Sequence, residues 1–412
     1  MVNNKRSEVT TACLSNGMPA VFVRCPRSAV EICGVCVKAG SRNELPTEYG
    51  LAHFVEHTLF KGTKKRRSSH IINRMEAVGG ELNAYTTKEE TVVYSVFPYG
   101  NLSRATELIG DLCANSTFPE SELEKEREVV ADEIDSYLDT PSEAIYDDFE
   151  DLIFAGSPLG HNILGYKDSL TRFDSKVCGD FVRRNYRADN MVAFYSGPRS
   201  ALSALRIIDR NFSVIEKGTA SGSVYAAPPV ADKFDITRSM PSHQAHCVIG
   251  ARVGSYLSPE RFATALLVNI MGGPGMNSFL NVELRERRGL VYSVDATTAL
   301  FSDCGMMTVY FGCDPADVMR CREIVARTFI NLKDKLTASR LEAAKKQYLG
   351  QLVLASENRE NSVLASARSL LWRGDISTPS ATEQKIKGLT VDDVLNVAKP
   401  MLSPSLLTFS PQ

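Results

Sequence analysis

The chain of 412 residues repeats the same order of structural elements on the two sides of a stretch near its middle. That stretch, residues 216–230, reads EKGTASGSVYAAPPV, and its small residues, glycines and paired prolines are typical of a linker. A chain of this length also exceeds the size at which one hydrophobic core usually stops growing. We therefore expect a first domain over residues 1–217, a linker over 218–230 and a second, homologous domain over 231–412.

The repeated order begins with an apolar run that ends in a Gly-Ser turn, at residues 35–41 and again at 248–255. Each run is followed by a proline-containing loop and an apolar helix, and then by an alternating strand pattern. The helices are predicted over 49–60 and 261–271, and the strands over 91–97 and 306–311. A periodic helix and a long charged helix come next in both halves. This order predicts an α+β fold of two duplicated domains, each a mainly antiparallel sheet backed by helices.

The apolar helix of the first half carries three polar residues that suit a metal site, namely His53, Glu56 and His57. The two histidines are four residues apart, so a helix places their imidazoles on one face, where both can reach one Zn²⁺. Glu56 lies along the same edge and can accept a proton from a metal-activated water without occupying a coordination position. Such polar groups are costly on an apolar helix unless a metal or hydrogen bonds satisfy them.

The alternative for this motif is a surface helix on which two histidines flank a glutamate by chance, because short metal-ligand patterns produce false positives. The same caution applies to His243 and His246, which lie in a strand-like stretch without a nearby carboxylate. We expect this second pair to be ordinary polar residues at the start of a strand.

A catalytic zinc needs a third protein ligand as well as an open position for water. The best acidic candidates lie on a helix predicted from Pro119 to Ile134, whose proline and acidic residues near the first turn favour a helix start. Glu126 and Glu133 are seven residues apart and share one face of this helix. Periodicity alone does not select the ligand from the acidic residues here.

The H-x-x-E-H order at 53–57 is the inverted zinc motif, and the chain resembles the zinc peptidase family of pitrilysin, insulin-degrading enzyme and mitochondrial processing peptidase. The similarity covers nearly the whole length and is greatest to short-chain, processing-peptidase-like bacterial members. The resemblance implies that His53, His57 and Glu133 bind zinc, that Glu56 is the catalytic base and that Glu126 supports activity without being a ligand. One Zn²⁺ per chain is expected, because the corresponding helix of the second half has no ligands.

Residues 79–86, GGELNAYT, look like the edge strand with which this family binds substrate. An exposed edge offers unpaired N–H and C=O groups, so an extended peptide can pair with it by strand addition. The alternative is a plain Gly-Gly turn that enters a strand. The substrate-binding residues implied by the resemblance are Gly80, Leu82, Asn83, Ala84 and Tyr85.

Residues 284–293 of the second half, LRERRGLVYS, resemble the R-x6-Y element of the same family. The resemblance implies that Arg285 and Tyr292 hold the substrate and stabilise the oxyanion that forms during hydrolysis. The alternative is a solvated basic turn, a common position for three arginines within four residues.

The resemblance implies a metalloendopeptidase that hydrolyses oligopeptides or unfolded segments inside a clam-shell chamber. In short-chain members two chains close around that chamber, so we expect a homodimer in which Arg285 and Tyr292 act in trans. The alternative is a catalytically silent or partner-dependent subunit that binds peptides without cleaving them alone. The retained motif residues argue against a silent subunit.

Composition gives little reason to expect other partners. The formal net charge of −2 does not favour nucleic acid or a membrane surface, and no apolar stretch is long enough to span a bilayer. Ten irregularly spaced cysteines, several of them in apolar runs, indicate free buried thiols and a reducing, cytoplasmic compartment. Cys33 and Cys36 are three apart on a predicted strand and should therefore point to opposite faces.

Overall fold

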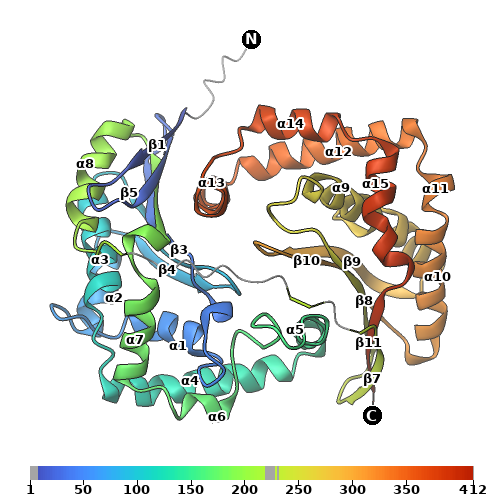
Figure 1. Cartoon of the computed structure of the whole chain (residues 1–412), viewed down its shortest axis with the longest axis horizontal. Coiled ribbons are helices and arrows are strands. Elements are labelled where there is room, and N and C mark those ends of the chain that lie inside the picture. Colours follow the sequence, from blue (N-terminus) through green and yellow to red (C-terminus); the bar gives the residue numbers. More distant parts are fainter. Residues whose placement is uncertain (1–7, 219–227, 230–231, 412) are drawn as a thin grey trace. The chain divides into compact units, whose positions relative to one another are not determined.

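The computed structural model describes residues 8–218, 228–229 and 232–411. Most of the predicted linker, residues 219–227 and 230, lies outside the described residues. The chain forms two compact units, each built around one sheet (Figure 1). The units are not continuous in sequence, because residues 135–160 belong to the second unit and residues 355–376 to the first.

The first unit contains a six-stranded sheet with the order β1-β2-β6-β3-β5-β4. Its strands are β1 (Glu8–Cys13), β2 (Pro19–Arg24), β3 (Val30–Val37), β4 (Glu81–Thr86), β5 (Thr91–Pro98) and β6 (Met191–Gly197). Neighbouring strands are antiparallel except β2 and β6, which are parallel. Among the strands that the structure describes, β4 pairs only with β5 and therefore forms an edge of the sheet.

Helices cover both faces of this sheet (Figure 1). The helices of the first unit are α1 (Leu51–Leu59), α2 (Ser68–Glu76), α3 (Leu102–Asn115), α4 (Glu120–Leu138, up to Ile134), α6 (Lys167–Leu170), α7 (Ser175–Asn185), α8 (Ala201–Phe212) and α13 (Arg359–Arg373). Strand side chains such as Phe22 and Val35 form the larger core with α1, α3, α4, α7 and α8. The alternate side chains, such as Val21 and Phe194, pack against α13.

The second unit repeats this plan with a five-stranded sheet of order β7-β11-β8-β10-β9. Its strands are β7 (Asp235–Met240), β8 (Ala245–Val253), β9 (Val291–Leu300), β10 (Gly305–Cys313) and β11 (Ser405–Pro411). The pair β7 and β11 is parallel and the others are antiparallel, as for β2 and β6 in the first sheet. Five strands of each sheet thus share one connectivity.

The helices of the second unit also lie on both faces of their sheet. They are α5 (Pro141–Ile153), α9 (Arg261–Gly272), α10 (Val318–Ile330), α11 (Leu332–Lys335), α12 (Ala338–Ser356, up to Leu354), α14 (Pro379–Lys387) and α15 (Val391–Ala398). Helices α9, α10 and α15 pack on one face, and α5 packs on the other through Ile145 and Phe149. Each sheet is therefore covered on one face by a helix from the opposite half of the chain, α13 in the first unit and α5 in the second.

The fold class predicted from the sequence is confirmed. The predicted apolar helices correspond to α1 and α9, and the predicted alternating strands to β5 and β10.

Cys33 and Cys36 are buried on opposite faces of β3, as their spacing predicts, and all ten cysteines are free. In the described part of the chain, no helix combines the length and apolar character needed to cross a bilayer.

Candidate metal centre

Helix α1 begins at a tightly packed turn. Gly50 precedes the helix with φ of 96°, a left-handed conformation, and a side chain there would come within 2.7 Å of the backbone oxygen of Leu164. The buried carboxylate of Glu44 then accepts the backbone N–H groups of Gly50 and Ala52, at 2.9 and 2.7 Å. This carboxylate also accepts a hydrogen bond of 2.9 Å from Nε2–H of His161. The start of α1 is thus fixed by a buried carboxyl group that accepts two backbone N–H groups otherwise without an intrahelical partner. Burial raises the pKa of Glu44 well above its ordinary value.

The apolar residues of α1 orient the helix in the core. Leu51, Phe54, Val55 and Leu59 are fully buried, which leaves the opposite face to carry the polar side chains. His53 is almost completely buried on that face, whereas Glu56 and His57 are half-buried. The imidazole rings of the two histidines lie 4.5 Å apart between their centroids.

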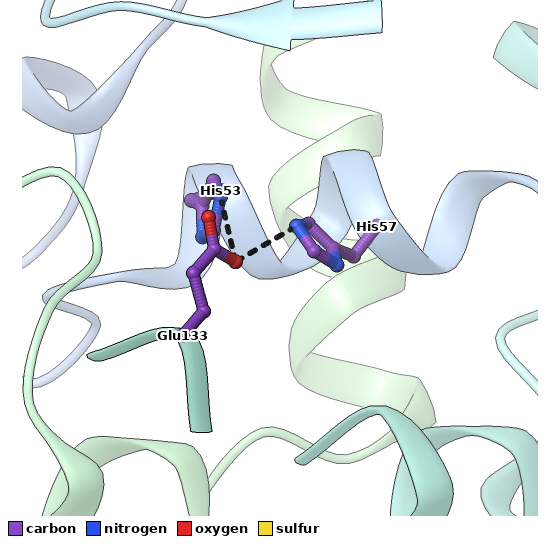
Figure 2. Close-up of side chains that lie close together, drawn as sticks. All are labelled: His53, His57 and Glu133. Carbon is purple, nitrogen blue, oxygen red and sulfur yellow. Dashed lines mark ion pairs between the residues drawn. The ribbon is translucent and has the colours of Figure 1, made fainter. Parts of the chain in front are cut away.

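Helix α4 brings a carboxylate to these histidines (Figure 2). Oε2 of Glu133 lies 3.4 Å from Nε2 of His57 and 3.8 Å from Nε2 of His53. One ligand atom from each of the three residues lies within 4.8 Å of the others. Figure 2 shows the Glu133 carboxylate pointing into the space between the two rings.

These distances match the requirements of a small metal ion. Two ligands about 2.1 Å from a tetrahedral zinc are about 3.4 Å apart, close to the observed separations between Nε2 and Oε2. Two imidazoles and one carboxylate are also a donor set that catalytic zinc sites use. The residues present therefore fit a zinc ion.

The pKa of His53 is consistent with this use. Burial and the neighbouring charge of His57 lower the pKa of His53 to about 4, so its imidazole is neutral near pH 7. A neutral imidazole offers the lone pair that a metal requires.

His57 is oriented by a second glutamate of α4. Its Nδ1–H donates a hydrogen bond of 3.0 Å to Oε1 of Glu126, whose other oxygen, Oε2, lies 2.6 Å from Nζ of Lys61. Burial disfavours the charged form of His57, but the hydrogen bond to Glu126 and the charges of Glu133 and Glu56 outweigh it and raise the pKa of His57. Burial of Glu126 is likewise outweighed by His57 and Lys61, and the pKa of Glu126 is lowered.

Glu56 lies beside the same histidine and contacts the end of β4. Burial raises the pKa of Glu56 above its ordinary value, against the opposing effects of hydrogen bonds from Thr86 and the charge of His57. A carboxylate with a raised pKa is suited to accept a proton and return it during a reaction near neutral pH.

The predicted substrate strand corresponds to β4, the edge strand beside α1. Leu82, Asn83, Ala84 and Tyr85 lie within β4 and are half-buried. Gly80 immediately precedes the strand, where a side chain would meet Cβ of Phe97 at 2.8 Å.

Arg285 and Tyr292 lie together in the second unit. Arg285 belongs to a short π-helical segment, η3 (Asn281–Glu286), and Tyr292 to β9. The guanidinium carbon of Arg285 is 5.9 Å from the centre of the Tyr292 ring. The Tyr292 side chain is 82% exposed, so it contributes little to the core and is free to contact a ligand.

Comparison with known families identifies the chain. Residues 22–167 match the model of the insulinase family, peptidase family M16, and residues 176–348 match the model of the peptidase M16 inactive domain. The two matches together span well over half of the chain.

The chain belongs to peptidase family M16.

Similar proteins carry names that refer to zinc. An uncharacterised zinc protease of Bacillus subtilis is 29% identical over 390 residues, which cover 94% of each chain. An uncharacterised zinc protease of Mycobacterium tuberculosis is 33% identical over 383 residues, which cover 90% of this chain and 85% of the relative.

Solved structures share the M16 fold. A structure from Pseudomonas fluorescens, described as a peptidase M16 inactive domain, covers 98% of both chains with a TM-score of 0.91 and 19% identity. The structure of a protease from Helicobacter pylori covers 98% of this chain and all of that chain, with a TM-score of 0.86 and 21% identity. These likenesses support the fold.

The two M16 matches divide the candidate residues. His53, His57 and Glu133 lie in the first matched region, and Arg285 and Tyr292 lie in the region that matches the inactive domain.

Sequence reasoning missed two features of this M16 site, the Glu44 contacts at the start of α1 and the Lys61 contact with Glu126. Lys61 lies beyond the end of α1, and its contact with Glu126 depends on how α1 and α4 pack. Nothing local connects Glu44 with His161.

Proposed function

We propose that this M16 chain is a zinc metalloendopeptidase. The observation that carries the proposal is the convergence of His53, His57 and Glu133 on one point beside Glu56. Zinc bound there would lower the pKa of a coordinated water and polarise the carbonyl of the scissile bond. The names of the similar zinc proteases agree with a metal of this kind.

Glu56 is the proton carrier of the proposed reaction. It shares α1 with the two histidines but is not among the three residues whose ligand atoms converge. We assign to it the acceptance of the proton from the attacking water and its transfer to the leaving amine, the role expected of a general base and acid.

Substrate binding is assigned to β4 and to the pair Arg285 and Tyr292. The free edge of β4 can pair with an extended peptide, and the strand ends at Thr86, which contacts Glu56. A phenolic hydroxyl and a guanidinium are donors suited to a developing oxyanion. We further propose a homodimer in which these two residues serve the metal centre of the partner subunit, around a chamber that admits oligopeptides or unfolded segments.

The second candidate function is a subunit that binds peptides without cleaving them alone. The convergence of a complete ligand set with a base on the same helix supports the enzyme instead. An inactive subunit has no need to maintain buried and half-buried ionisable groups, which are costly without a function.

The test measures zinc content and cleavage of unstructured fluorogenic peptides for the wild type and for Glu56→Gln. We expect the wild type to bind zinc and cleave, and Glu56→Gln to retain zinc while kcat falls by about 10²–10⁴-fold. Full activity of Glu56→Gln would refute the assigned role of Glu56. A zinc-loaded wild type that cleaves no member of a peptide library would favour the silent subunit.

A further inference from the structure

Lys61 lies just beyond the C-terminal end of α1, one residue after Phe60, which caps the helix. Its Nζ is 2.6 Å from Oε2 of Glu126, and its side chain is only 27% exposed. The side chain of Glu126 is 8% exposed, so this ion pair is shielded from solvent on the glutamate side. A shielded pair of this kind is less weakened by water and salt than an ion pair on the surface.

The Glu126 carboxylate divides its two oxygens between two partners. Oε1 accepts the Nδ1–H of His57 at 3.0 Å, and Oε2 contacts Lys61. The lysine therefore fixes the rotation of the carboxylate and keeps Oε1 directed at the imidazole. Without Lys61, Glu126 would keep a charge with little solvent access and lose the partner that neutralises it.

The hydrogen bond to Glu126 selects one tautomer of His57. Because Nδ1 carries the proton, the lone pair is on Nε2, the nitrogen that lies 3.4 Å from Glu133. Hydrogen bonds to the second nitrogen of a metal-binding histidine are known to fix both the tautomer and the direction of the ring.

His53 lacks a comparable arrangement. Its Nδ1 is buried and has no hydrogen-bond partner among the residues that the structure describes. The His53 ring is instead held by its burial on α1. Among the described residues, a hydrogen bond to Nδ1 therefore orients the ring of His57 but not the ring of His53.

We propose that Lys61 is a positioning residue of the metal centre, which holds Glu126 so that His57 presents Nε2 to the metal. The inference deepens the proposed function and rests on it for the identity of the metal. It predicts that Lys61 affects metal affinity although its amino group contacts no predicted ligand atom directly. Loss of a residue that holds a metal ligand in place without binding the metal lowers metal affinity by about 10–100-fold.

The experiment measures the zinc dissociation constant of the full chain by competition with a chromophoric chelator, beside thermal unfolding of the zinc-free protein. We expect Lys61→Met to raise the Kd by about 10-fold or more, and Lys61→Arg, which keeps the charge, to restore most of the affinity. Lys61→Gln gives the same comparison with a milder change should Lys61→Met fail to fold. The matched control is Lys65→Met, because the Lys65 side chain is 59% exposed and its Nζ lies as far as 3.8 Å from Oδ1 of Asp111.

The double variant Lys61→Met/Glu126→Gln tests whether Lys61 acts on His57 through Glu126. Glu126→Gln should also raise the Kd, and adding Lys61→Met to it should change the Kd little further, because both act on His57 through one carboxylate. A wild-type Kd in Lys61→Met or Lys61→Gln would overturn the inference. Fully additive effects in the double variant would also overturn it, because Lys61 would then act without Glu126.

The two proposals fail in different ways. A wild type that binds zinc but cleaves no peptide would refute the proposed function, while a raised Kd in Lys61→Met would still support the positioning role. An active wild type with an unchanged Kd in Lys61→Met would refute only the positioning role.

Discussion

Oε2 of Glu133 lies 3.4 Å from Nε2 of His57, although the two residues belong to different helices. The contact follows from core packing. Leu123 and Val130 anchor α4 in the same core that receives the apolar face of α1. The polar residues of α4 that border this buried face are thereby brought to the polar face of α1.

We predict that Glu133→Gln weakens zinc binding more than the substitutions of Lys61 and Glu126 do. An amide is a poorer metal ligand than a carboxylate, so the Kd for zinc should rise by more than about 100-fold. Chelator competition measures the Kd, and Glu128→Gln, an exposed change on the same helix, is the control. Wild-type zinc content and affinity in Glu133→Gln would exclude this glutamate as a ligand.

The sequence predicts the parts of this site that depend on local geometry. The spacing of His53 and His57 determines that they share a helical face, and the seven-residue spacing of Glu126 and Glu133 does the same on α4. The choice of Glu133 as ligand required the family resemblance, because periodicity does not show which acidic residue of α4 meets α1. That meeting depends on how two helices pack.

Long-range contacts were not predictable for the same reason. The helical patterns of α5 and α13 are local, but the pairing of each with a sheet from the opposite half of the chain is set by tertiary contacts. The contact of Glu44 with His161 joins residues 117 positions apart, and no local pattern connects them.

Glu44→Ala should destabilise the fold through α1. The change leaves the backbone N–H groups of Gly50 and Ala52 and the imidazole of His161 without their acceptor. Unpaired buried donors of this kind should lower the free energy of unfolding by about 2–4 kcal/mol. Chemical denaturation of the zinc-free protein measures the free energy of unfolding, and Glu124→Ala, at an exposed position, is the control. A change smaller than about 0.5 kcal/mol, as expected of a surface substitution, would contradict this role.

His246 on β8 should make stability depend on pH. Burial lowers the pKa of His246 below its ordinary value of 6.5, and its Nδ1 lies 2.9 Å from the hydroxyl of Tyr310. The unfolded chain therefore binds a proton at a higher pH than the folded chain, so the free energy of unfolding should fall as the pH drops below about 6.5.

The measurement for His246 is denaturant unfolding between pH 8 and pH 5 for the wild type and His246→Gln, without zinc. The stability difference between them should shrink or reverse on acidification, because only the wild type gains the extra proton on unfolding. The exposed His243→Gln serves as control. Parallel pH profiles for the wild type and His246→Gln would contradict the prediction.

Tyr292→Phe should slow catalysis without affecting zinc binding or folding. The tyrosine is 82% exposed, so loss of its hydroxyl should leave the melting temperature unchanged. Removal of one oxyanion donor lowers kcat by about 10²–10³-fold in other hydrolases. Steady-state cleavage of a fluorogenic peptide gives kcat, and Tyr99→Phe, at another exposed tyrosine, should match the wild type. An unchanged kcat in Tyr292→Phe would remove this residue from the site.

Complementation between two inactive variants tests the proposed homodimer. If Tyr292 serves the partner subunit, a dimer of one Glu56→Gln chain and one Tyr292→Phe chain contains one site with both an intact Glu56 and an intact Tyr292. A random mixture of equal amounts should then recover about a quarter of the wild-type activity, since half of the dimers are mixed and each has one working site.

If both residues act within one chain, every site in the mixture carries a defect and no activity returns. The measurement uses co-refolded or co-expressed variants, with each variant alone as control, and activity no greater than the sum of the two would refute the arrangement in trans.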